Sequence, residues 1–170
     1  MVGRDVVAVE ELQVVARRLV LGEVLSDVLP DAATEALSRG VESPALVELA
    51  CLSARDVRAG VADARGLFEM ALAELGLAMP SKNDARKAVR RQAAQRLASD
   101  APVTADCLHE IYWQTCYITD DPDHARLVNQ WLSLWLSWVE QPANRPELEP
   151  GIRAAATNLA AATVPSAHLP

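Results

Sequence analysis

Side chains that could carry acid–base or metal chemistry come closest together at Cys107, His109 and Glu110. A metal site or a general acid–base pair needs side chains that converge on one point. Successive residues of a helix diverge by about 100°, so His109 and Glu110 do not converge if this segment is helical. The chain also lacks the metal-site spacings H-E-x-x-H, paired Glu-x-x-His and C-x-x-C. We therefore predict no metal and no cofactor, and we assign no catalytic residue.

Nucleotide-binding and nucleophile motifs are absent as well. The 7 glycines form neither G-x-G-x-x-G nor G-x-x-x-x-G-K, and no G-x-S-x-G occurs. Asp120, Asp121 and Asp123 fit helix capping better than a calcium loop, which needs more ligands at alternating positions. We favour a protein without catalytic activity over an enzyme of an unfamiliar type.

Three tryptophans follow one face of a helix predicted over residues 124–140. Projected at about 100° per residue, the polar side chains of this segment fall within an arc of about 100°. Trp131, Trp135 and Trp138 lie near the middle of the remaining apolar arc. Such a stripe either packs in the core, which we favour, or anchors an interface with a partner or a second copy.

A second aromatic pair, Trp113 and Tyr117, lies four positions apart on the preceding predicted helix, beside His109 and Glu110. The pair points away from the apolar face of that helix. We favour cover of the pair by the C-terminal segment; the alternative is that the pair is exposed in a binding patch or pocket.

Basic residues concentrate in a helix predicted over residues 81–99, where six of the sixteen lysines and arginines fall within fifteen positions. Arg86, Arg90 and Arg91 are the candidates for contact with an acidic partner. A solvated helix face paired with neighbouring acids is the alternative that we favour. The chain as a whole carries a net charge of -7, which argues against general nucleic-acid binding.

The elements that must position these residues are predicted to be helices throughout, because apolar residues recur at helical spacing and glycine is scarce. We expect an all-α fold with about six or seven helices in a single compact domain over residues 1–142. Its last part is expected to be a helical hairpin of residues 104–118 and 122–141. Three prolines then interrupt the chain, so residues 143–170 are expected to form a Pro/Ala-rich segment, partly helical or loose. One helix is expected over residues 56–75.

Cysteine usage and hydropathy indicate the compartment. Cys51, Cys107 and Cys116 are an odd number, and the last two fall about 180° apart on one predicted helix. This pattern is typical of a reduced, intracellular protein. The start of the chain does not resemble a signal peptide, and the most apolar segment has 13 residues, short of the roughly 20 that span a bilayer. We expect an acidic cytoplasmic protein that does not bind membranes.

The stretch G-V-E-S-P-A-L-V-E-L-A over residues 40–50 resembles a segment of small uncharacterised helical proteins from high-GC actinobacteria. The likeness continues loosely into A-L-A-E-L-G over residues 71–76. This resemblance implies a helical fold and a bacterial source, and it carries no catalytic residue. We therefore predict a helical protein-interaction or accessory module that binds a partner protein or a second copy. The alternative is a helical pocket for an apolar or aromatic small molecule.

Overall fold

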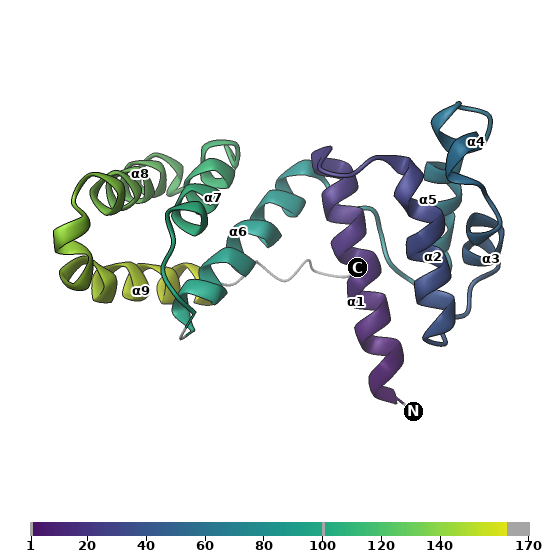
Figure 1. The fold of residues 1–170 in the computed structure, drawn as a ribbon, viewed down its shortest axis with the longest axis horizontal. Helices are drawn as coiled ribbons and strands as arrows, with labels where there is room; N and C mark the ends of the chain where they lie inside the picture. Colours follow the sequence, from purple (N-terminus) through teal and green to yellow (C-terminus); the bar gives the residue numbers. More distant parts are fainter. Residues whose placement is uncertain (1, 100, 163–170) are drawn as a thin grey trace. The chain divides into compact units, whose positions relative to one another are not determined.

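The computed structural model describes residues 2–99 and 101–162, with side chains from residue 7 onward, and these ranges contain helices and connecting loops only (Figure 1). The elements are, in chain order, α1 (Val2–Leu21), the 3-10 helix η1 (Ser26–Val28), α2 (Leu29–Ser38), α3 (Pro44–Ala50), α4 (Ala54–Arg58), α5 (Ala64–Glu74), α6 (Lys82–Ala98), α7 (Ala105–Cys116), α8 (His124–Glu140), the 3-10 helix η2 (Pro142–Asn144) and α9 (Arg145–Ala161). The all-α class expected from the sequence is confirmed for these ranges. Among the described residues, no helix combines the length and the apolar character needed to cross a membrane.

The described residues contain more helices than the six or seven expected, partly because the prediction of a single helix over residues 56–75 is wrong. Two helices, α4 and α5, occupy that stretch. Gly60 has a φ of +70°, a left-handed conformation that ends α4 and that glycine adopts without steric cost. Asp63 then caps α5, because its side chain accepts a hydrogen bond from the Gly66 N–H at 2.8 Å.

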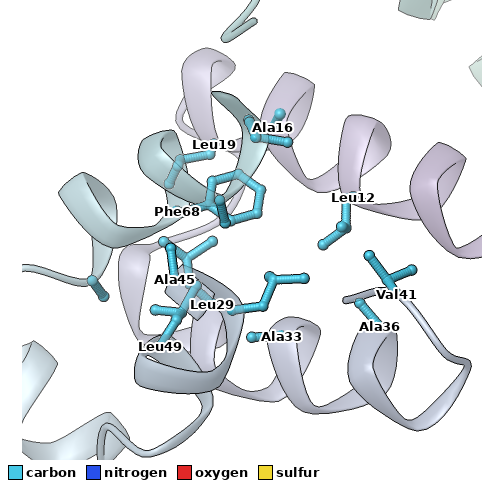
Figure 2. Close-up of a cluster of buried hydrophobic side chains, with 14 of the residues drawn as sticks. Leu12, Ala16, Leu19, Leu29, Ala33, Ala36, Val41, Ala45, Leu49 and Phe68 are labelled. Carbon is cyan, nitrogen blue, oxygen red and sulfur yellow. The ribbon is translucent and has the colours of Figure 1, made fainter. Parts of the chain in front are cut away.

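Helix packing divides the chain into two compact units, residues 1–85 and residues 86–170, each with its own cluster of buried apolar side chains. In the first unit, Leu12 of α1, Leu29 of α2 and Phe68 of α5 pack into one cluster and are no more than 2% exposed (Figure 2). Small side chains such as Ala33 and Ala45 complete this cluster and allow the helices to approach closely.

The second unit contains the residues singled out in the sequence from Arg86 onward. Leu97 of α6, Ile111 of α7, Trp131 of α8 and Ile152 of α9 are fully buried in one cluster. Within this unit α7 packs along α8, and residues 117–123 connect the two helices. Burial of one face of each helix leaves the opposite face of α7 in contact with solvent.

The division between the units falls after residue 85, whereas the boundary expected from the sequence lies near residue 142. The reason is the C-terminal helix α9, whose Ile152, Ala156 and Leu159 are buried in the second cluster. Much of the Pro/Ala-rich segment is therefore a helix that belongs to the second unit. Residues 163–170, on which part of that prediction falls, lie outside the described residues.

Candidate functional site

Five ring-bearing side chains of the second unit contact one another in an unbroken series across α7 and α8. They are His109, Tyr112, Trp113 and Tyr117 at α7 and Trp135 of α8, and we call this set the aromatic surface. The centroids of successive rings lie between 4.9 and 6.0 Å apart, within the range of favourable aromatic pairs. The series joins residues that are 26 positions apart in the chain, from His109 to Trp135.

Trp135 connects the two helices. Its ring stacks on Tyr112 with an interplanar angle of 11° and a centroid separation of 5.8 Å. Its other neighbour is His109, at a centroid separation of 4.9 Å. From His109 the series continues to Trp113 at 6.0 Å and then to Tyr117 at 5.1 Å, the last pair meeting edge to face.

The local sequence explains why α7 presents these rings. His109, Trp113 and Tyr117 are spaced by four residues and therefore share one face of the helix. Leu108 and Ile111 lie on the buried side and are fully inaccessible to solvent. The side chain of Thr104 caps the helix, accepting the Cys107 N–H at 3.2 Å, and so sets where this pattern begins.

Trp113 and Tyr117 are exposed, at 47% and 44% of their full accessible surface. The favoured expectation, cover by the C-terminal segment, is not seen in the described part of the chain, where both side chains are exposed; residues 163–170 of that segment lie outside it. Burial of large aromatic side chains is favourable, so this adjacent exposed pair is the candidate binding surface of the second unit.

The three tryptophans of α8 have separate roles. Trp131 is fully buried and Trp138 is 7% exposed, so both belong to the core of the second unit. The guanidinium of Arg145 lies 5.2 Å from the centre of the Trp138 ring and donates to the Trp138 carbonyl at 3.0 Å. Trp135 is partly buried at the edge of the core, where it supports the aromatic surface. The stripe is thus core at two positions and part of the candidate site at one.

Arg86 belongs to α6, the basic helix predicted from the sequence, and adjoins the aromatic surface. Its guanidinium lies over the ring of Tyr117, 4.3 Å from the centroid, and its Nη1 is 3.4 Å from Oε1 of Gln114. Gln114 in turn donates to Glu110 at 2.7 Å. The candidate residues Arg86 and Glu110 are therefore joined to the rings through one cation–π contact and one buried amide.

Other cations of α6 bind groups within the second unit. Lys87 pairs with Asp120 at 2.8 Å, and Arg90 pairs with Asp121 at 3.0 Å. Arg91 donates to the carbonyl of Ala160 in α9 at 3.1 Å. Arg90 is only 8% exposed, so it is part of the interior and not of a solvated helix face.

These ion pairs change the acidity of the two aspartates. The hydrogen bond from Lys87 lowers the pKa of Asp120 below its ordinary value. Burial raises the pKa of Asp121, but the hydrogen bonds from the Asp123 N–H and from Arg90 outweigh it, so the net direction is also downward. Both carboxylates are therefore held in the charged form, which pairs with Lys87 and Arg90 of α6.

Arg153 of α9 was not singled out in the sequence, although it fixes the end of α6. Its guanidinium donates to the carbonyls of Leu97, Ser99 and Ala101 and pairs with Glu149 at 2.6 Å. The spacing of Glu149 and Arg153, four residues apart, was visible in the sequence, but the carbonyls that Arg153 reaches are more than fifty residues away.

Tyr112 has a second neighbour besides Trp135. The adjacent Cys116 thiol raises the pKa of the Tyr112 hydroxyl above its ordinary value. Cys51, Cys107 and Cys116 are all free thiols. In the described ranges, no group of three or more His, Cys, Asp or Glu side chains is arranged to hold a metal ion.

Comparisons of the chain with protein-family models, with characterised proteins and with solved structures found no match. The resemblance of residues 40–50 to helical actinobacterial proteins therefore stays a prediction. The basis for a function is therefore the aromatic surface and its contacts in the second unit.

Proposed function

We propose that this chain is a helical protein-interaction module and that the aromatic surface is where its partner binds. The observation that carries the proposal is the exposure of Trp113 and Tyr117, side by side on one face of α7. Tryptophan and tyrosine are enriched at the energetic centres of protein interfaces, because they bury much area at little cost in side-chain entropy.

The contacts that the rings make with one another favour the same function. α7 packs against α8, and His109, early in α7, meets Trp135, late in α8. Tyr112 stacks on Trp135 from the same helix α7, so the rings are held by neighbours before any partner arrives. A preorganised surface loses less conformational entropy on binding than a flexible one.

A pocket for an aromatic small molecule is the alternative function. Small ligands are usually held in sites that bury 70–90% or more of their surface. Trp113 and Tyr117 are nearly half exposed and line an open face of α7. This openness suits the broad surface of a partner protein better than a small molecule.

Site-specific photocrosslinking tests the proposal. Trp113 is replaced by benzoylphenylalanine in the full chain, which is then irradiated in cells of its source organism. Met70 of the first unit, an apolar side chain that is 56% exposed, is replaced in the same way as a matched control. We expect one discrete covalent adduct from position 113 and none from position 70.

The mass of the adduct identifies the class of partner. An adduct of twice the 18.3 kDa chain mass indicates a second copy, and any other discrete mass indicates a different protein. Both results support an interaction surface at Trp113. Absence of an adduct at position 113, or the same adducts from both positions, contradicts the proposal.

A further inference from the structure

We infer that the aromatic surface binds arginine side chains from a segment of the partner protein. This inference rests on the proposed function and adds the chemistry of the partner. It depends on three observations: a guanidinium already stacked at one end of the surface, two carboxylates of α7 that form no ion pair among the described residues, and the exposure of the Trp113 indole.

The contact between Arg86 and Tyr117 shows how this surface accepts a guanidinium. The carbon at the centre of the Arg86 guanidinium lies 4.3 Å from the centroid of the Tyr117 ring. Attraction between a cation and the face of a ring is strongest for tryptophan. Trp113, the next ring along α7, has no arginine or lysine stacked on it within the described residues.

The charge of α7 complements a cationic partner. The helix contains Asp106 and Glu110 and no lysine or arginine. In the described ranges neither carboxylate has an ion-pair partner. The two are four residues apart on one side of the helix, an arrangement in which like charges repel. A bound cation would remove that repulsion.

Glu110 also places negative charge close to the exposed indole. It lies three residues before Trp113, so the two side chains are neighbours on the helix surface. One of its oxygens, Oε1, accepts from Gln114 at 2.7 Å. Its second oxygen can accept from a donor that lies over the ring of Trp113.

Arginine fits this arrangement better than lysine or an apolar side chain. The guanidinium is planar and stacks on a ring while its N–H groups, which lie in its own plane, reach a neighbouring carboxylate. Lysine presents a strongly hydrated point charge and stacks less well. A wholly apolar partner would cover Asp106 and Glu110 without pairing them, and burying an unpaired carboxylate is costly.

The test is a titration of the full-length chain with the capped peptide Gly-Arg-Gly-Arg-Gly, followed through the indole N–H signals in a nitrogen–proton NMR spectrum. The matched probe replaces both arginines by citrulline, which has nearly the same shape and no charge. We expect the arginine peptide to shift the Trp113 signal in a saturable manner. The citrulline peptide is expected to bind about 3- to 10-fold more weakly. The Trp131 signal, from a buried ring, is expected not to move.

Substitutions test the contribution of the Trp113 ring and that of the carboxylates separately. Trp113→Phe keeps a ring face and is expected to retain part of the affinity, whereas Trp113→Leu keeps apolar area and is expected to lose it; both are followed by the Trp135 signal. Asp106→Asn with Glu110→Gln should weaken binding and flatten its dependence on salt. Met70→Ala is the control in the first unit. Circular dichroism confirms that each variant is folded.

Equal affinity for the arginine and citrulline peptides overturns the inference, as does equal binding by the Trp113→Leu variant. These failures are distinguishable from failure of the proposed function. Crosslinking through position 113 together with no preference for arginine leaves an interaction surface of different chemistry. If position 113 gives no crosslink and the arginine peptide is not preferred, both proposals are contradicted.

Discussion

Individual residues of the second unit divide into those that hold the fold and those that face solvent. Trp131 is fully buried, whereas Trp113 is 47% exposed. Trp131→Ala should destabilise the protein by about 3–5 kcal/mol, because it removes a large ring and leaves a cavity. Trp113→Ala should cost less than about 1 kcal/mol, as expected for a surface position. Denaturant unfolding measures both, and equal losses would contradict the assignment of Trp131 to the core.

Tyr112 offers a spectroscopic test of its immediate surroundings. In the variant Tyr117→Phe, Tyr112 is the single tyrosine, because the chain has only two. We expect its tyrosinate absorbance to develop at a pH above the ordinary pKa of about 10, since Cys116 raises the pKa of this hydroxyl. A further change, Cys116→Ala, should bring the midpoint back toward that ordinary value. An unchanged midpoint would show that the thiol is not the cause.

At the scale of elements, the basic helix α6 acts as an internal connector of the second unit. The pair Arg90–Asp121 has side chains only 10% and 16% exposed, whereas the surface pair Arg65–Glu69 is 57% and 47% exposed. Arg90→Gln should cost about 3 kcal/mol, because it leaves Asp121 charged and poorly hydrated. Arg65→Gln should cost less than about 1 kcal/mol. A similarly small loss of unfolding free energy in both variants would contradict a buried ion pair at Arg90 and would support the solvated helix face expected from the sequence.

The same connection predicts how stability depends on pH. The pKa values of Asp120 and Asp121 are lowered in the folded chain, so their contribution is present above the unfolded pKa of about 3.9 and is lost as pH falls through the folded values. Asp121→Asn should therefore be less stable than wild type at pH 6. This difference should shrink as the pH falls below about 4. A difference that stays constant with pH would mean that the Asp121 charge does not stabilise the fold.

Asp106→Asn is the matched control for this pH series. Asp106 is an exposed aspartate of the same unit and has no ion-pair partner in the described ranges. Its unfolding free energy at pH 6 should stay close to that of wild type.

At the scale of the whole molecule, each unit has its own buried cluster. Phe68 lies in the first cluster and Trp131 in the second, and both are fully buried. Distant, unconnected substitutions usually act independently. Phe68→Ala should therefore speed amide hydrogen exchange mainly within residues 1–85, and Trp131→Ala mainly within residues 86–170. Equal acceleration throughout the chain by either variant would indicate one cooperative unit.

Local patterns in the sequence predicted the helical class and the ring-bearing face of α7. Periodic apolar residues are enough for this purpose, because one face of each helix must be buried. The same patterns missed the break between α4 and α5, where the positive φ of Gly60 and the Asp63 cap outweigh apolar spacing. They also placed Arg90 on a solvated face, because its partner Asp121 is 31 residues away.

The sequence by itself determined that this protein is helical, and it identified Trp113 and Tyr117 as the pair without a place on the buried face of their helix. Only the tertiary structure decided that Trp135 joins them while Trp131 and Trp138 enter the core. It also decided that Lys87, Arg90 and Arg91 of α6 bind groups of the second unit. The physical reason is that helical periodicity depends on residues three or four positions apart, whereas burial and ion pairing depend on which helices meet in space.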